Sequence, residues 1–339
     1  MKPVLVPLEF SPRLLVGVAE SAAGAFLEQC ARENSAPVTL VLARAAKQLD
    51  GLAEDISFFH HLAVGEKATA EILLYPELPS DSGESTALAG GVFERQCDRL
   101  AVLAALVSRK ENKSAPKLVI VTTLAALLQP APKPGDLAAQ EIRLAPGTKI
   151  NFRGLADKLG GALGYDCEAV CESPGQYAVR GGLLDVYPFN AAAPARLDFF
   201  GDELESIRSF DPTTQLTAET LPELVIAPAP RSLGGGVAAG LLNFLPPRAQ
   251  WLVHEPARQS IEQPENYSIP EKLAAPHPTL QTIFAARAGT SDTWTGLADI
   301  DEPGGAFAIE LEVGVGLVAC GAFVFGNPAR DRTVHRGEL

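Results

Sequence analysis

The sequence predicts an α/β protein, in which a smaller α+β unit is inserted into a doubly wound and mainly parallel sheet. Strand-like and helix-like segments alternate through the first third of the chain, which is typical of parallel sheets flanked by helices. A proline-rich break at 129–135 (QPAPKPG) then marks a domain boundary. The stretch that follows is rich in glycines and short strands over Gly164–Gln215. These observations divide the chain into domains at 1–134, 137–216 and 217–339.

The alternating region is expected to form pairs of a strand and a helix. Apolar, β-branched runs predict buried strands, and longer amphipathic runs predict helices. In chain order, and beginning with a strand, the expected elements alternate at Leu14–Val18, Ala22–Glu33, Val38–Leu42, Ala45–Phe58, Glu71–Tyr75, Phe93–Ser108, Leu118–Thr122 and Leu124–Leu128. The Ser- and Gly-rich segment Pro79–Gly91 is expected to be an exposed loop.

The inserted unit is expected to begin with a helix over Phe152–Leu163 and to continue as a series of strands. Gly201 and Asp202 separate two strand-like runs, Ala195–Phe200 and Glu203–Phe210. A glycine followed by an aspartate between two such runs predicts a tight hairpin turn.

The final third of the chain has a less regular pattern. We expect a helix over Gly234–Leu245, a strand over Trp251–His254 that returns to the parallel sheet, and a helix over His277–Ala288. Past about Gly304 the residues show no clear period. We interpret this ending as that of a truncated chain, and we expect the natural protein to continue beyond Leu339.

One strand of the inserted unit presents an unusual face. The period of two in a strand places Arg196, Asp198 and Phe200 on one side. Leu197 and Phe199 take the other side and can supply the core contacts. A large aromatic beside an arginine, on a face that is otherwise charged, has the composition of a protein-binding hot spot.

An alternative interpretation needs no partner protein. Arg196 would pair with Asp198 or Glu203 on its own sheet, and Phe200 would cover a neighbouring loop. Most charges on strands are simply solvated, so without further information this interpretation is favoured.

Composition limits the classes of function. The chain has 28 Lys and Arg against 41 Asp and Glu, which gives a formal net charge of −13. A nucleic-acid-binding surface gains affinity by neutralising phosphates, so this balance argues against DNA as the main ligand. The chain has no run of 18 apolar residues and no pattern of a secretion signal. We therefore expect a cytoplasmic protein without membrane contacts.

Metal and acid–base sites are not favoured. Cys167 and Cys171 have a spacing that suits two metal ligands, but no second Cys or His pair lies near them. The scattered cysteines favour free thiols in a reducing compartment. The strand-rich stretch also has a dense set of carboxylates, whose alternation favours solvation over convergence. These are Asp185, Asp198, Asp202, Glu203 and Glu205. We expect no metal, no cofactor and no catalytic residue.

The first strand leads into a segment where a phosphate-binding loop would lie. A working loop of the type G-x-x-x-x-G-K-[ST] uses glycines and backbone amides, a lysine for the phosphates and a hydroxyl for Mg²⁺. After Gly17, the second glycine is replaced by Ala22, the lysine by Ala23 and the hydroxyl residue by Gly24. Glu20 adds a negative charge. This degenerate loop lacks the groups that phosphoryl transfer requires.

Two long motifs, GQYAVRGGLLDVYP and ARLDFFGDELESIRSFDP, resemble the UvrA-binding domain of the bacterial transcription-repair coupling factors, the Mfd family. The resemblance is strongest over Gly164–Gln215 and weaker over Arg13–Phe59 and Pro222–Ala257. The N-terminal module of that family is itself similar to the excision-repair protein UvrB. The resemblance implies a degenerate P-loop, RecA-like parallel-sheet domain with an inserted α+β UvrA-interaction domain.

The resemblance also implies a function and its residues. In the family, the UvrA contacts include the positions that match Arg180, Arg196 and Phe200, and these three retain the family's residue types. The implied function is a non-catalytic module that recruits UvrA to stalled RNA polymerase in nucleotide excision repair. The alternative is the N-terminal part of an ATP-dependent DNA translocase, with RNA polymerase and DNA bound by regions absent here. A UvrB-like damage clamp is opposed by Ala22, Ala23 and Gly24, which replace the nucleotide-binding residues.

Overall fold

The computed structural model of the protein describes residues 13–16, 20–65, 70–79, 89–112, 114–230, 239–255, 287 and 290–298. The expected Gly17 of the degenerate loop lies outside these residues, as does nearly all of the helix expected over His277–Ala288. In the part of the chain that is described, no helix combines the length and apolar composition needed to cross a bilayer.

Among the described residues, six strands form a parallel sheet in the order β1-β16-β15-β2-β4-β3. Their bounds are β1 Arg13–Val16, β2 Val38–Ala43, β3 Ala70–Tyr75, β4 Lys117–Thr123, β15 Gln250–His254 and β16 Thr293–Ala298. All six residues of β2 are buried, as expected of a strand that is covered on both faces of a parallel sheet. The predicted α/β class with a parallel sheet is therefore confirmed.

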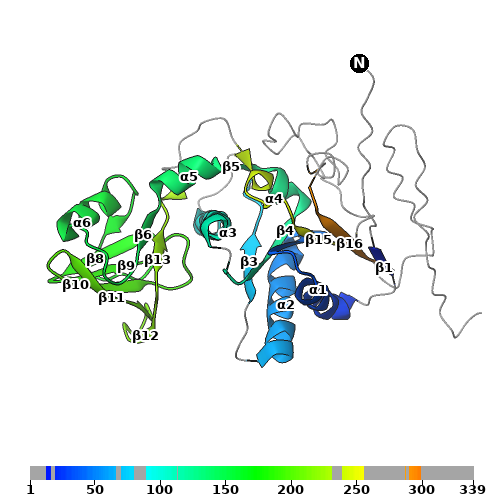
Figure 1. Ribbon diagram of the computed structural model, residues 1–339, viewed down its shortest axis with the longest axis horizontal. Coiled ribbons are helices and arrows are strands. Elements are labelled where there is room, and N and C mark those ends of the chain that lie inside the picture. The colour runs from blue at the N-terminus through cyan, green and yellow to red at the C-terminus, as the bar shows by residue number, and fades with distance from the viewer. Residues whose placement is uncertain are drawn as a thin grey trace, which may run out of the picture.

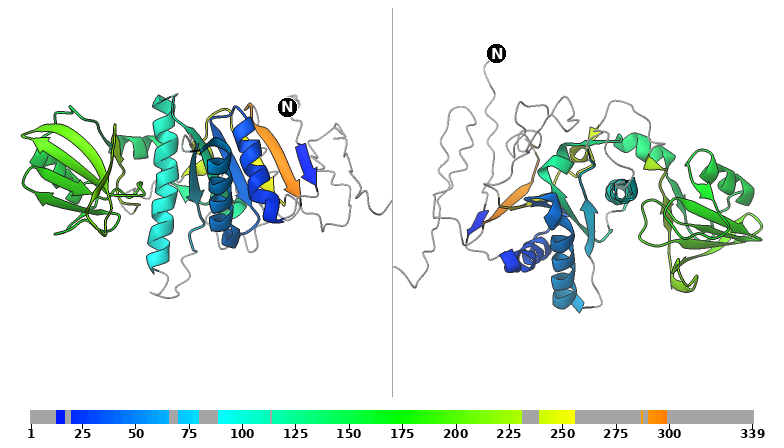
Figure 2. Two further views of the ribbon diagram at one scale, coloured as in Figure 1. Left: turned by 90° about the horizontal axis from the view of Figure 1, so that it is seen from below. Right: turned by 180° about the vertical axis from the view of Figure 1, so that it is seen from behind.

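Helices cover both faces of this sheet (Figure 1, Figure 2). On one face, α1 (Ala23–Glu33) and α2 (Leu49–Val64) bury a cluster that includes Val41 and Val121. On the other face, α3 (Ala89–Glu111) and α4 (Leu124–Leu128) bury a cluster that includes Leu40 and Ile120. The alternation of β2 and β4 residues between two apolar cores explains why both strands are apolar over most of their length.

Every element expected before the proline-rich break is present; the helix at Leu124–Leu128 has the expected bounds, and the other elements have shifted ends. The helix expected from Ala45 begins at Leu49, because Ala46–Gln48 forms a separate 3-10 turn, η2. The last residues of the expected Pro79–Gly91 loop are helical, since α3 already begins at Ala89.

A second sheet follows in the order β12-β11-β10-β9-β8-β7. Its bounds are β7 Asp166–Cys167, β8 Gln176–Arg180, β9 Leu183–Val186, β10 Ala195–Phe200, β11 Glu203–Phe210 and β12 Thr217–Thr220. The β7–β8 pair is parallel and the other pairs are antiparallel, so the sheet is mixed. The predicted bounds of β10 and β11 are confirmed. Thr217–Thr220 was not expected as a strand.

One helix covers one face of the second sheet. The helix α6 (Phe152–Gly160) ends earlier than the expected Leu163. Its Phe152 ring meets the ring of Phe199 on β10 edge to face, with centroids 5.2 Å apart. Leu155 and Leu159 of α6 are fully buried in the same core. Between Ile142 and Ala229, all of which the structure describes, α6 is the one α-helix, so no other helix of this unit lies on the opposite face.

The second sheet lies between two strands of the parallel sheet in sequence, since β4 precedes it and β15 follows it. Short paired strands join the two parts: β5 (Pro130–Ala131) with β14 (Ala239–Gly240), and β6 (Ile142–Leu144) with β13 (Leu224–Ile226). The helix α5 (Pro134–Gln140) lies within the expected proline-rich break and beyond it. Figure 1 shows α3 standing between the two sheets.

Two expectations for the final third are wrong or incomplete. The described part of the helix expected over Gly234–Leu245 consists instead of β14 and the 3-10 turn η6 (Leu241–Asn243). The glycine-rich composition of this segment gives a helix little support, and β14 finds a partner in β5. The strand β16 was not expected, although the strand at Trp251–His254 is confirmed as β15.

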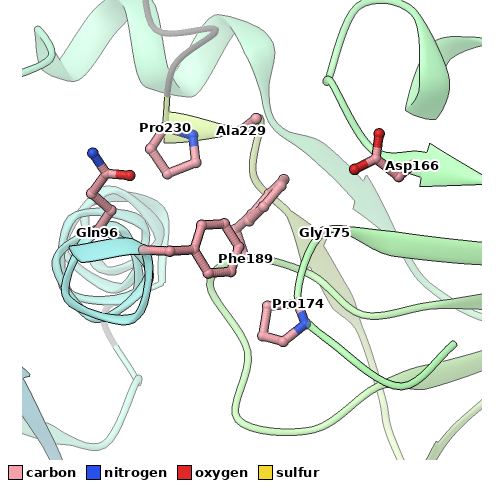
Figure 3. Close-up of a pocket in the computed structure, with 8 residues that line it drawn as sticks. Gln96, Asp166, Pro174, Gly175, Phe189, Ala229 and Pro230 are labelled. Atoms are coloured by element: carbon pink, nitrogen blue, oxygen red, sulfur yellow. The ribbon is translucent and has the colours of Figure 1, made fainter. Parts of the chain in front are cut away.

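The contact between α3 and the second unit includes a pocket of about 190 Å³ (Figure 3). Phe93 of α3 meets Phe189 edge to face, with ring centroids 5.9 Å apart. Gln96, Gly175 and Pro230 also line the pocket. Its mainly apolar lining and the aromatic contact join the two parts of the molecule.

Candidate protein-docking site

The uncovered face of the second sheet carries the side chains that the sequence singled out. Along β10, Leu197 and Phe199 are buried in the core. Arg196 and Asp198 are partly exposed, and Phe200 is 78% exposed. The predicted division of β10 into an apolar core face and a charged outer face is confirmed. The alternative that Phe200 covers a neighbouring loop is wrong.

The turn that carries Phe200 is anchored to α6. Gly201 has a φ of 64°, which suits a glycine in a two-residue hairpin turn. The carboxylate of Asp202 accepts a hydrogen bond from the backbone N–H of Phe152 at 3.0 Å and another from Nδ2 of Asn151 at 3.2 Å. Asp202 was expected to be merely solvated, but it bonds to the N-terminus of a helix. Phe200 is therefore held on a fixed turn.

Arg196 forms a two-point ion pair across to β9. Its Nε donates to Oδ1 of Asp185 at 2.7 Å, and its Nη2 donates to Oδ2 at 2.8 Å. The side chain of Asp185 is 3% exposed and that of Arg196 is 17% exposed. The hydrogen bonds to Asp185 raise the pKa of Arg196, so the guanidinium is charged at any ordinary pH.

Arg196 was expected to pair with Asp198 or with Glu203 on its own sheet. Both expected partners are wrong. Arg196 lies directly opposite Asp185 in the β9–β10 register, which brings the two side chains together on the outer face. Asp185 was also expected to be solvated with the other carboxylates of this stretch. It is buried instead, and both of its carboxylate oxygens accept hydrogen bonds from Arg196.

The carboxylate of Asp198 has a different partner. Its Oδ2 accepts a hydrogen bond from Nη2 of Arg208 on β11 at 3.2 Å. Both of these side chains are more than one-third exposed. An exposed ion pair of this kind contributes little to stability, so Asp198 and Arg208 can exchange this contact for another at small cost.

Arg180 lies on the same face at the end of β8. It pairs with Leu183 in the β8–β9 register, and Leu183 pairs in turn with Asp198. Arg180 is exposed, and its Nη2 donates to the carbonyl of Ala169 at 2.7 Å. This row of paired residues runs across the face between Arg196 and Phe200, so the three expected site residues share one surface.

The glycines after Arg180 serve the close approach of two strands. Gly181 has a φ of 61° in the β8–β9 turn. A Cβ on Gly182 would lie 2.9 Å from the carbonyl oxygen of Phe199, so only glycine fits without a shift. The turn that follows Arg180 therefore lies against β10.

The other end of the outer face is covered by the chain itself. Cys171, Ala178 and Phe210 form a small buried cluster there. Burial raises the pKa of Cys171 to about 12, and its thiol donates to the carbonyl of Gln176 at 3.3 Å. Such a thiol has little thiolate character. Over the residues that the structure describes, no three acidic, His or Cys side chains form a metal-binding group.

The degenerate loop leads into helix packing. Glu20–Ala22 forms the short 3-10 turn η1, and α1 begins at Ala23. A Cβ on Gly24 would lie 2.4 Å from Cβ of Asp55 in α2. Gly24 therefore allows the close contact between α1 and α2.

The sequence analysis did not predict the structural roles of three residues on the outer face. Asp185, Asp202 and Phe210 shape the outer face, but each acts through a partner on another element. The alternation of LLDVYP against ARLDFF could have indicated the pair of Asp185 with Arg196, had the strand register been assigned.

Comparison with known families identifies the class of the inserted unit. The family model described as the UvrB interaction domain matches residues 142–231, which include the second sheet together with β6 and β13. An α/β domain with a parallel sheet thus carries a UvrB interaction domain.

Comparison with individual proteins agrees with the match to the family model. The chain is 30% identical to the transcription-repair-coupling factor of Bacillus subtilis (strain 168) over 220 residues, or 64% of the chain. It is 33% identical to that of Myxococcus xanthus over 221 residues, or 63% of the chain. It is also 28% identical to the UvrABC system protein B of Thermotoga neapolitana over 131 residues, which are 39% of the chain and 18% of that protein.

The aligned segments are 17% of the length of the two coupling factors. The chain is similar to the N-terminal region of the Mfd-type transcription-repair coupling factors, and it contains a UvrB interaction domain. The resemblance inferred from the sequence motifs is confirmed.

Proposed function

We propose that this chain is a non-catalytic interaction module that recruits UvrA in transcription-coupled nucleotide excision repair. The uncovered face of β8 to β11 is the docking surface, with Arg180, Arg196 and Phe200 in contact with UvrA. The cytoplasm is the compartment where such a module would act. The domains at 1–134, 137–216 and 217–339 are its units.

The observation that carries this proposal is the exposure of Phe200. This residue is 78% exposed on a turn that Asp202 fixes to α6. An exposed aromatic on a rigid support loses little conformational entropy on binding, and it buries a large apolar area. The charged side chains of Arg196 and Arg180 flank it on the same sheet, as at the centre of a protein-binding hot spot.

The parallel-sheet domain has the role of a scaffold in this proposal. We propose that it is a RecA-like domain whose P-loop has degenerated. The residue types support this view, because Ala23 and Gly24 at the start of α1 stand where a working loop has its lysine and its hydroxyl residue. We expect no ATP binding, and saturable binding at micromolar ATP in calorimetry would contradict this part.

A second candidate function follows from the length of the relatives. The matched segment is 17% of the length of the coupling factors in Bacillus subtilis and Myxococcus xanthus. This favours, as the second candidate, the N-terminal part of an ATP-dependent DNA translocase. RNA polymerase and DNA would then bind through regions absent from this sequence.

Hydrogen exchange with and without purified UvrA tests the proposed surface. We expect slower exchange in β8 and β10 and in the turns at Gly181 and Gly201, with exchange in α1 and α2 unchanged. Slower exchange confined to α1 and α2, or no change anywhere at saturating UvrA, would contradict the assignment.

A further inference from the structure

The guanidinium of Arg196 is held on two sides. The carboxylate of Asp185 accepts hydrogen bonds from Nε and from Nη2 of Arg196, at 2.7 and 2.8 Å. The ring of Phe210 lies beneath it, with its centroid 4.8 Å from the central carbon. A bidentate carboxylate and an aromatic face together restrict the long side chain to one orientation.

This orientation leaves one end of Arg196 available. No other hydrogen bond of Arg196 is found among the described residues, so Nη1 and the second hydrogen of Nη2 remain as donors. These donors can bind a carboxylate or a carbonyl of another protein end-on.

The neighbours of Arg196 do not favour this orientation by themselves. Arg208 lies directly opposite Arg196 on β11, and like charges facing each other across two strands repel. Asp198 is two residues along β10 and already accepts a bond from Arg208. Without Asp185, Arg196 would compete with Arg208 for Asp198.

We propose that Asp185 is a positioning residue for docking: it holds Arg196 with the Nη end directed outward, where it meets an acidic or carbonyl group of UvrA. Asp185 is almost fully buried, so it acts through Arg196 and makes no contact with the partner itself. This inference rests on the proposed function.

A double-mutant cycle separates positioning from structural support. UvrA affinity is measured by calorimetry for wild type, Asp185→Asn, Arg196→Gln and the double variant, each well below its melting temperature. We expect Asp185→Asn to weaken binding about 10-fold, and to have an effect of less than about 2-fold in the Arg196→Gln background. A purely structural role would give the same change in both backgrounds.

Two further variants complete the experiment: a control, and a replacement for Asp185→Asn if that variant does not fold. Asp198→Asn removes the same charge from the same face at an exposed ion pair, and we expect less than about a 3-fold change in affinity. If Asp185→Asn does not fold, Asp185→Glu replaces it. The longer acid keeps the charge but displaces the guanidinium, and we expect about a 5-fold loss of affinity.

The outcomes distinguish this inference from the proposed function. Wild-type affinity in Asp185→Asn, equal losses in both backgrounds, or wild-type affinity in Asp185→Glu overturns the positioning role. Wild-type affinity in both Arg196→Gln and Phe200→Ala overturns the docking surface itself. Loss of affinity in those two variants with none in Asp185→Asn overturns the positioning role alone.

Discussion

The two sheets of this molecule differ in how helices cover their faces. The parallel sheet has helices on both sides, and α1 and α2 pack so closely that Gly24 has no room for a side chain. The mixed sheet has α6 on one side only, and its other side carries Arg180, Arg196 and an exposed Phe200. A sheet covered on both faces has no surface to offer, so we expect the parallel sheet to act as a scaffold and the mixed sheet to dock.

The largest effect is expected where neighbouring residues lie on opposite faces of β10. Leu197 is fully buried, and Leu197→Ala should lower the free energy of unfolding by about 2–5 kcal/mol through lost burial and a cavity. Asp198→Ala should change it by less than about 1 kcal/mol. Urea titration followed by circular dichroism measures both. Equal losses would show that the outer face is also a packing face.

The second expectation concerns the scaffold. Gly24→Ala would place a Cβ 2.4 Å from Cβ of Asp55 and force α1 away from α2, at a cost of about 1–3 kcal/mol. Gly51→Ala is the matched control, because its Cβ would meet no atom within 4 Å and alanine favours a helix. Thermal melts of the two variants should move in opposite directions. An unchanged melting temperature in Gly24→Ala would remove the packing explanation.

A smaller effect is expected at the anchor of the docking turn. Asp202→Ala removes the acceptor for the Phe152 N–H at the start of α6, and should lower stability by about 1 kcal/mol. Hydrogen exchange at the α6 N-terminus and in the Gly201 turn should become faster together. Faster exchange at α6 alone would show that the turn is held by other contacts.

The smallest expectation concerns pH and lies in α3. Burial, with the negative charges of Asp50 and Glu94, raises the pKa of Asp98 from 3.8 to about 6. Between about pH 4 and pH 6 the folded state therefore binds more protons than the unfolded state. The contribution of this group to the free energy of unfolding then falls as the pH rises through that range. Because the carboxyl is partly exposed, Asp98→Asn should stabilise the protein at pH 7 by only about 1 kcal/mol.

Chemical denaturation at about pH 4 and at pH 7 tests this expectation. The free energy of unfolding of Asp98→Asn should exceed that of the wild type at pH 7 and should equal it at about pH 4. An equal difference at both pH values would mean that the carboxyl does not titrate in this range.

The parts that the sequence predicted well depend on local signals. The strands β2 and β4 are long apolar runs, and only a sheet covered on both sides accommodates such runs. The β10–β11 hairpin could be assigned because alternation and the pair of Gly201 and Asp202 both indicate the same turn. The division of β10 into two faces followed from the same alternation.

The parts that the sequence did not predict depend on partners distant in the chain. The partner of Arg196 is set by the register of β9, and nothing near Arg196 in the sequence indicates it. The strands β12 and β16 were missed because Thr-rich runs carry a weak apolar signal. Gly24 could be read as the loss of the hydroxyl residue that holds Mg²⁺, but its close approach to Asp55 depends on how two helices pack.

The central claim is that an exposed aromatic on the mixed sheet docks UvrA. Its most direct test is a calorimetric titration of UvrA with Phe200→Ala and with Phe58→Ala, a phenylalanine on α2 that is 63% exposed. We expect Phe200→Ala to lose about 2–4 kcal/mol of binding energy, or about 30- to 1000-fold in affinity, without a change in melting temperature. Phe58→Ala should bind like wild type. Wild-type affinity in Phe200→Ala, or equal losses in the two variants, would contradict the claim.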